Sequence, residues 1–155
     1  MAMKTKYIIG NWKANKTIAE AEEWCKEFFS RDFSDLSEDI KIIICPPFHL
    51  LSTVKKYVEG NSQISLGCQD VSSDAAGVHT GEVPAQILRG LVDYGIIGHS
   101  ERRRQYGETI DIVNQKLKQC DDSGIEPILC ISKKEELPED YTGIVTYEPP
   151  EAISA

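Results

Sequence analysis

The sequence predicts a protein of the α/β class, in which parallel strands alternate with helices. Six short apolar runs rich in β-branched residues recur along the 155 residues, and segments with helical spacing of apolar residues lie between most of them. The runs are almost continuously apolar, which is typical of parallel strands buried on both faces. Because no linker, repeat or low-complexity tract interrupts the series, we expect a single domain over residues 1–155.

The expected strands are short and similar in length. They cover Lys6–Ile9, Lys41–Cys45, Ile64–Cys68, Tyr94–Ile97, Pro127–Ile131 and Ile144–Tyr147. Parallel strands need crossover connections of about a dozen residues, which are right-handed almost without exception. The first four connections have room for a helix. The fifth has room only for a stub that Pro138 would end, so the fifth helix should be nearly absent.

Four helices are expected from start signals and apolar stripes. Thr17 and Glu20 have the spacing of a capping box, in which two side chains satisfy free backbone N–H groups at a helix start. Pro84 suits the first turn of the third helix. The stripes are Ile18, Ala21, Cys25, Phe28 and Phe29; then Leu50, Val54, Tyr57 and Val58; then Ile87, Leu88 and Leu91; and finally Ile110, Val113, Leu117 and Cys120.

Composition excludes several classes of function. The chain has 25 acidic and 17 basic residues and a net charge of −8, so it lacks the concentrated positive charge of a nucleic-acid-binding protein. No apolar run approaches the roughly 18 residues of a membrane span, and no signal-peptide pattern opens the chain. The five scattered cysteines lack a CxxC pair, which favours reduced thiols in a cytoplasmic protein. Without a nucleotide-binding loop or metal-ligand spacing, we expect no cofactor and no metal.

Asn11 and Lys13 form the first candidate site, where the first strand ends. Successive strand residues face opposite sides, so continued strand structure would point these two side chains the same way. An amide and an ammonium would then converge at the carboxyl end of the strand, where parallel sheets and barrels bind ligands. The alternative is a solvated lysine in a turn formed by the asparagine.

His99 follows the fourth expected strand and precedes a polar stretch that could open a helix, with Ser100 as a plausible cap. The positive end of a helix dipole disfavours an imidazolium, so His99 would be a neutral hydrogen-bond donor to a carbonyl. The alternative is a packed structural histidine. The next three residues, Glu101, Arg102 and Arg103, have the composition of a solvated charge run. A sharper hypothesis is that Glu101 orients Lys13 and that Arg102 tethers neighbouring loops.

Glu148 follows the sixth expected strand and precedes Pro149, which favours an extended backbone at the glutamate. A carboxylate held rigidly beside apolar residues suits a general base, although a surface glutamate before a proline loop is the plainer alternative. The three candidate groups end strands one, four and six. The carboxyl ends of parallel strands lie on the same rim, so the three groups share one side of the sheet. This shared position is stronger evidence for a site than any one of the groups alone.

Five motifs together resemble those of the triosephosphate isomerase family. They are Gly10–Lys13, Cys45–Phe48, Gly77–Glu82, Ile97–Arg103 and Tyr147–Pro149, and they occur in the family's order. The resemblance covers nearly the whole chain, and the last two motifs are the most specific. It implies strands 1–6 of a (β/α) TIM barrel that interconverts dihydroxyacetone phosphate and glyceraldehyde 3-phosphate in glycolysis and gluconeogenesis, without a cofactor.

The resemblance also implies roles for individual residues. Glu148 would be the base that moves the proton between two substrate carbons, and His99 the neutral group that polarises the carbonyl. Asn11 and Lys13 would bind substrate and stabilise the enediolate oxygens, with Glu101 supporting Lys13. Arg102 is expected to act as a second supporting residue.

Two features depart from the family pattern. A full barrel has eight strands and typically about 250 residues, and strands seven and eight usually supply the phosphate site. In the family's lid segment, Glu151 stands where a large aromatic is usual, and Ser154, which we count among the substrate-binding residues, stands at a glycine hinge.

The loop carrying Thr80 reaches into a second subunit in the family. We therefore expect a homo-oligomer, or a complementary chain that supplies strands 7–8.

Two other functions are consistent with the pattern. One is a catalytically inactive TIM-barrel remnant that acts as a binding or interaction module. The other is an open, flavodoxin-like sheet with unrelated chemistry, which would be the default at this length but for the five ordered motifs.

Overall fold

The structure is a computed structural model that describes residues 5–149 and residue 151. Within it the chain forms two compact units. The first contains the described residues up to Gln69 together with Gly90–Tyr94. The second contains Asp70–Arg89 and the described residues from Gly95 onward.

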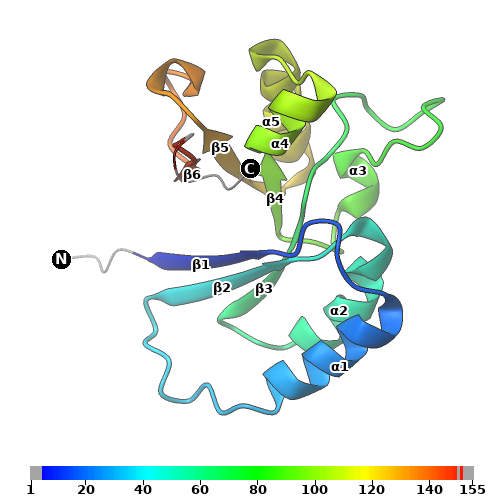
Figure 1. The fold of residues 1–155 in the computed structure, drawn as a ribbon, viewed down its shortest axis with the longest axis vertical. Coiled ribbons are helices and arrows are strands. Elements are labelled where there is room, and N and C mark those ends of the chain that lie inside the picture. Colours follow the sequence, from blue (N-terminus) through cyan, green and yellow to red (C-terminus); the bar gives the residue numbers. More distant parts are fainter. Residues whose placement is uncertain (1–4, 150, 152–155) are drawn as a thin grey trace. The chain divides into compact units, whose positions relative to one another are not determined.

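The first unit is a three-stranded parallel sheet with helices on one face (Figure 1). Its strands are β1 (Lys6–Asn11), β2 (Ile40–Cys45) and β3 (Ile64–Cys68), paired in that order. The register places Ile8 beside Ile42, and Ile44 beside Leu66. The helices are α1 (Ile18–Phe29), a 3₁₀ turn (Phe48–Leu50) and α2 (Leu51–Val58), and α1 and α2 pack against each other.

The helix starts of the first unit follow the sequence signals. Thr17 and Glu20 make both halves of the predicted capping box at the start of α1. In the apolar stripe of α1, Ala21 and Cys25 are buried and the last two members, Phe28 and Phe29, are half-buried, whereas Ile18, the first residue of the helix, is 54% exposed. The expected stripe therefore reaches the core one turn later than its spacing indicated.

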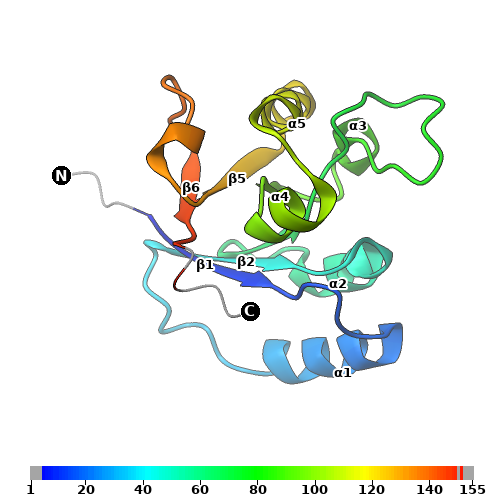
Figure 2. The same cartoon turned by 45° about the horizontal axis from the view of Figure 1, so that its top comes forward.

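The second unit holds the remaining strands and helices, apart from Tyr94, the first residue of β4 (Figure 2). They are α3 (Ala85–Leu88), β4 (Tyr94–Ile97), α4 (Ser100–Tyr106), α5 (Ile110–Ser123), β5 (Glu126–Ile131) and β6 (Ile144–Tyr147). The strands follow the order β4-β5-β6, with β5 and β6 parallel, and α5 packs against α3 and β5. Between β5 and β6 lies only a 3₁₀ turn, Lys134–Glu136, so the near absence of a fifth helix is confirmed.

Burial on both faces, expected for every strand, holds for the inner strands only. All four residues of β4 are buried, as are the last four of β5. In β6, by contrast, Val145 is 40% and Tyr147 is 62% exposed, and in β1 Ile8 is 55% exposed. These two strands stand first and last in the strand order, and each pairs with a single neighbour, so less of each is covered.

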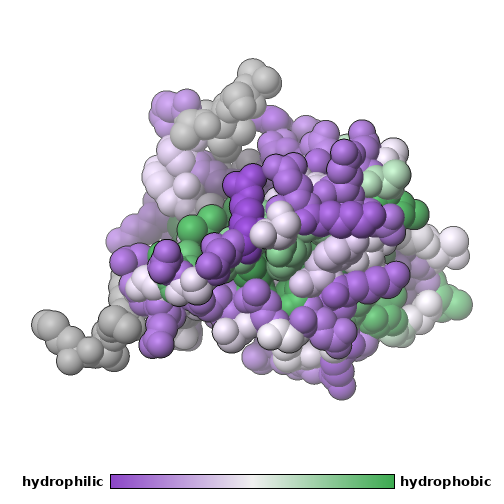
Figure 3. Space-filling view, turned by 90° about the horizontal axis from the view of Figure 1, so that it is seen from below, coloured by the Kyte–Doolittle hydropathy of each residue, from purple (hydrophilic) through white to green (hydrophobic). Residues whose placement is uncertain are grey.

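Parallel strands alternating with helices confirm the α/β class and the repeats of an incomplete (β/α) TIM barrel with six strands. The face in Figure 3 is mostly hydrophilic, with hydrophobic side chains showing between charged ones. Across the described residues, no helix combines the length and the apolar character needed to cross a membrane.

Candidate active site

The first group of predicted site residues lies in a turn just after β1. The Oδ1 atom of Asn11 accepts a hydrogen bond of 2.9 Å from the backbone N–H of Lys13, and Lys13 has a φ of 53°. The strand ends at Asn11, so the strand alternation expected to align the two side chains does not extend to Lys13. A short polar side chain that accepts from the backbone two residues on favours such a turn over a continued strand.

Gln69, at the end of β3, fixes this turn from outside. Its Nε2 group donates to the carbonyl of Lys13 at 2.8 Å and to the carbonyl of Cys45, at the end of β2, at 2.9 Å. A side chain from β3 therefore holds the backbone at Lys13 and the end of β2 together. A left-handed conformation at a lysine costs free energy and persists only where such bonds hold it.

His99 lies at the amino end of α4, in the second unit, with its side chain only 13% exposed. The structure makes His99 itself the cap of this helix, whereas Ser100, predicted as the cap, is the first helical residue. The reason is that the imidazole Nδ1 atom accepts a hydrogen bond of 3.2 Å from the backbone N–H of Glu101. Since a backbone N–H only donates, Nδ1 carries no proton and the ring proton lies on Nε2.

Glu148 follows β6 and faces His99. Its backbone N–H donates to the carbonyl of Ile131 at 2.7 Å, which anchors it to the end of β5. Its Oε1 atom lies 3.1 Å from Nε2 of His99, and its Oε2 atom accepts from the backbone N–H of Ser100 at 2.9 Å. With its side chain 15% exposed, this carboxylate is desolvated on most sides, bonded by one backbone N–H group and in contact with the imidazole of His99.

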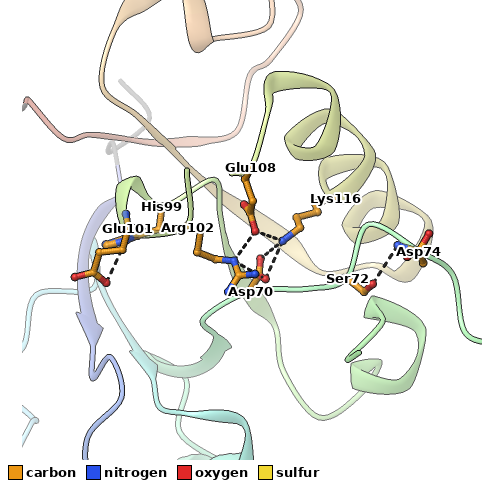
Figure 4. A network of polar contacts seen from close by, with 8 residues as sticks. All are labelled: Asp70, Ser72, Asp74, His99, Glu101, Arg102, Glu108 and Lys116. Atoms are coloured by element: carbon orange, nitrogen blue, oxygen red, sulfur yellow. Dashed lines mark hydrogen bonds and ion pairs between the residues drawn. The ribbon is translucent and has the colours of Figure 1, made fainter. Parts of the chain in front are cut away.

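Arg102 belongs to a cluster of charged side chains that links Asp70 to α4 and α5 within the second unit (Figure 4). Its Nε atom lies 2.8 Å from Asp70 and also contacts Glu108. Lys116, on α5, is 4% exposed and bonds both oxygens of Asp70, at 2.7 and 2.8 Å, as well as Glu108. One lysine and two carboxylates are thus buried together beside Arg102, whose side chain is 33% exposed, and their burial is tolerable only because each charge faces an opposite one.

Burial dominates the electrostatics of this cluster. Removal from water raises the pKa of Asp70 to about 6, even though Lys116 and Arg102 act in the opposite direction. Glu101 lies apart from the cluster, with Oε2 at 3.7 Å from Nδ1 of His99 (Figure 4).

The structure therefore brings His99, Glu101 and Glu148 together in the second unit, while Asn11 and Lys13 share a turn in the first. Ser154, a predicted substrate-binding residue, lies outside the described residues. Among the residues that the structure describes, no group of three or more metal-ligating side chains lies together.

Sequence reasoning missed three polar residues that shape the site: Lys116, Gln69 and Arg103. For Lys116 a signal was present, because it lies three residues after Val113 and four before Cys120, on the buried stripe of α5. Nothing comparable pointed to Gln69 or to Arg103, which the sequence placed in a solvated charge run.

Polar residues at the carboxyl ends of parallel strands in a βα series are typical of TIM-barrel proteins. Comparison with known proteins agrees. The sequence profile described as triosephosphate isomerase matches residues 6–155, and the chain belongs to the triosephosphate isomerase family.

Individual relatives support the same assignment. A protein named triosephosphate isomerase from Alkaliphilus metalliredigens is 42% identical over 132 residues, which cover 84% of this chain and 52% of the relative. Its namesake from Dehalococcoides mccartyi is 43% identical over 135 residues, 86% of this chain and 52% of the relative. The namesake from Shewanella denitrificans is 39% identical over 140 residues, which cover 86% of this chain and 53% of the relative. The chain thus spans about half the length of the curated relatives it matches.

Proposed function

We propose that this chain carries the proton-transfer residues of a triosephosphate isomerase, which interconverts dihydroxyacetone phosphate and D-glyceraldehyde 3-phosphate. The observation that supports this most directly is the contact between Nε2 of His99 and the carboxylate of Glu148. It places a neutral imidazole donor beside a desolvated carboxylate, the two groups that a proton shift next to a carbonyl requires.

Each step of the reaction has a residue to perform it. Glu148 removes a proton from the carbon next to the substrate carbonyl and returns it to the neighbouring carbon. Between the two transfers the substrate is an enediolate, and the Nε2–H group of His99 donates to the oxygen that bears the developing charge. The hydroxyl proton also passes from one enediolate oxygen to the other, so the substrate is isomerised with no atom gained or lost and no net oxidation.

The remaining predicted residues assist these two. Asn11 and Lys13 bind the substrate and add positive potential at the enediolate oxygens. Glu101 supports Lys13, Arg102 supports the helix that presents His99, and Ser154 contributes to the lid over the substrate. For Glu148 to reach a substrate carbon, it must first exchange its bonds to His99 and to the Ser100 N–H group.

We further propose that the working enzyme contains more protein than this chain. A TIM barrel closes with eight strands, and its phosphate site usually lies after strands 7–8. Those strands would come from a complementary segment or chain, and homo-oligomerisation through the loop carrying Thr80 would follow the family. The five cysteines are all buried thiols, which supports a reducing, cytoplasmic setting.

Isomerase turnover of the purified chain over a range of protein concentrations tests the proposal. Glu148→Gln and His99→Ala should each lower turnover by about a hundredfold or more, because each removes a proton-transfer group. Glu139→Gln makes the same chemical change at an exposed glutamate and should leave turnover unaltered. Circular dichroism shows whether each variant folds.

The results separate the hypotheses. If turnover rises with concentration, self-association completes the site. If turnover appears only when a segment with strands seven and eight is added, that segment completes the site. Turnover that survives Glu148→Gln would contradict the assigned base. The absence of turnover in every assembly would contradict the proposed activity and favour the alternative of an inactive binding module.

A further inference from the structure

Arg103 reaches back from α4 to two strand ends. Its Nε group donates to the carbonyl of Gly98 at 2.7 Å, and its Nη2 group donates to the carbonyl of Cys130 at 3.1 Å. Gly98 directly follows β4, and Cys130 lies in β5. The partly buried guanidinium therefore spans the carboxyl ends of both strands, rather than lying in the solvated charge run that the sequence suggested.

Gly98 supports this arrangement independently. A Cβ atom at this position would lie 2.7 Å from Nη2 of Arg103 and 3.1 Å from a methyl group of Val113, closer than side-chain atoms normally approach. Gly98 also has a φ of 69°, which favours glycine. The glycine thus leaves the space through which the arginine passes, and its backbone presents the carbonyl that the arginine binds.

One carbonyl lies one residue from His99, and the other lies one residue from the carbonyl that anchors Glu148. Gly98 precedes His99, and Cys130 precedes Ile131, whose carbonyl accepts the backbone N–H of Glu148. A continuous series of bonds therefore runs from the segment that carries His99, through Arg103, to the segment that carries Glu148.

We propose that Arg103 is a positioning residue, which sets the distance between the imidazole of His99 and the carboxylate of Glu148 by clamping the ends of β4 and β5. Its catalytic importance rests on the proposed function, whereas its effect on the geometry does not. Arginine suits the task because its planar guanidinium holds two donors in a fixed fork. Lysine keeps the charge but concentrates its donors on one atom, so it binds both carbonyls poorly.

The test compares Arg103→Lys with Arg104→Lys, the same change at an exposed neighbouring arginine. Two quantities are measured on the intact chain without substrate: the urea midpoint of unfolding, and the NMR signal and solvent exchange of the His99 Nε2–H proton. Arg103→Lys should change the His99 signal and speed its exchange by about tenfold, the equivalent of one ordinary hydrogen bond. Arg104→Lys should alter neither quantity.

If Arg103→Lys lowers the midpoint while the His99 signal stays as in the parent, Arg103 only stabilises the fold and the proposal is overturned. Should Arg103→Lys fail to fold, Arg103→Ala is studied with guanidinium chloride at a non-denaturing concentration. Recovery of the parental His99 signal supports positioning, and recovery of the fold without that signal contradicts it.

Kinetics separate this inference from the proposed function. In any assembly with turnover, Arg103→Lys should lower kcat by about ten- to a hundredfold, because small misplacements of reacting groups are costly, and should leave KM within about threefold. An unaltered kcat would overturn the positioning role. Absence of turnover in the parent would contradict the proposed function alone, since the His99 signal still reports the geometry.

Discussion

Nε2 of His99 and Oε1 of Glu148 lie 3.1 Å apart, so the two groups assigned to proton transfer contact each other directly. The second carboxylate oxygen accepts from the Ser100 N–H group, and the second imidazole nitrogen accepts from the Glu101 N–H group. The amino end of α4 therefore orients both side chains, one through each N–H group.

This arrangement predicts the tautomer of His99. Because Nδ1 accepts a backbone hydrogen bond, the neutral form of the ring should carry its proton on Nε2. Long-range proton–nitrogen NMR spectra of the chain should show an unprotonated Nδ1, and Glu148→Gln should shift the Nε2–H signal. Glu139→Gln, at an exposed glutamate, should leave it unchanged. A proton found on Nδ1 would contradict the geometry described for His99.

The elements that could be predicted from the sequence are those governed by local pattern. The strands coincide with their apolar runs to within two residues, and Thr17 and Glu20 form the expected capping box. Local pattern failed at Lys13, where the side chain of Asn11 bonds the backbone and ends the strand. It also failed at Ser100, because the His99 ring took over the capping role.

The polar interior could not be predicted in the same way. Whether a charged side chain is solvated or buried depends on partners that are remote in sequence, and Lys116 lies 46 residues from Asp70. Arg103 likewise bonds a carbonyl 27 residues away. Local periodicity places such residues on a face, but only the tertiary fold supplies the group that each one meets.

Loss of the buried ammonium of Lys116 should be costly. Lys116→Met would leave Asp70 and Glu108 with Arg102 as their remaining cation in the cluster, and breaking a buried ion pair from one side typically costs about 3–5 kcal/mol. Urea denaturation should show a loss of this size in the free energy of unfolding. Lys118→Met removes an exposed lysine on the same helix and should cost less than about 1 kcal/mol. Equal losses for the two variants would contradict this account of the cluster.

Asp70 should make stability depend on pH. Its pKa in the folded protein is about 6, raised by burial from 3.8, so between these values the folded state holds a proton that the unfolded chain has released. The contribution of Asp70 therefore grows as pH falls from 7 toward 4, and it is lost as pH rises through 6.

The variant Asp70→Asn removes this titration. From pH 7 to pH 4, the free energy of unfolding of the parent should rise by roughly 1–3 kcal/mol relative to that of Asp70→Asn. Urea titrations at several pH values measure it. Asp140→Asn, at an exposed aspartate, should show a difference that barely changes with pH. If the free energy of unfolding of the parent fell on acidification relative to that of Asp70→Asn, folding would lower the pKa of Asp70 instead of raising it.

Tyr141 should stabilise the short connection that replaces the fifth helix. Its hydroxyl lies 2.8 Å from the carbonyl of Pro127, at the start of β5, and 3.2 Å from that of Ile144, at the start of β6. Tyr141→Phe removes this donor and leaves the carbonyls without it, which should lower the free energy of unfolding by about 1 kcal/mol. Tyr147→Phe alters a tyrosine that is 62% exposed and should have little effect.

Burial also raises the pKa of Tyr141 to about 12, which gives a spectroscopic test of the same contact. The unfolded chain releases this proton near pH 10, so the contribution of Tyr141 is complete below that pH and is lost as pH rises from 10 to 12. Ultraviolet titration of the folded chain should show a late tyrosine ionisation near pH 12, and Tyr141→Phe should remove that step. If all tyrosines of the parent ionised together, the hydroxyl would be solvated, and the β5–β6 connection would have to be held by other contacts.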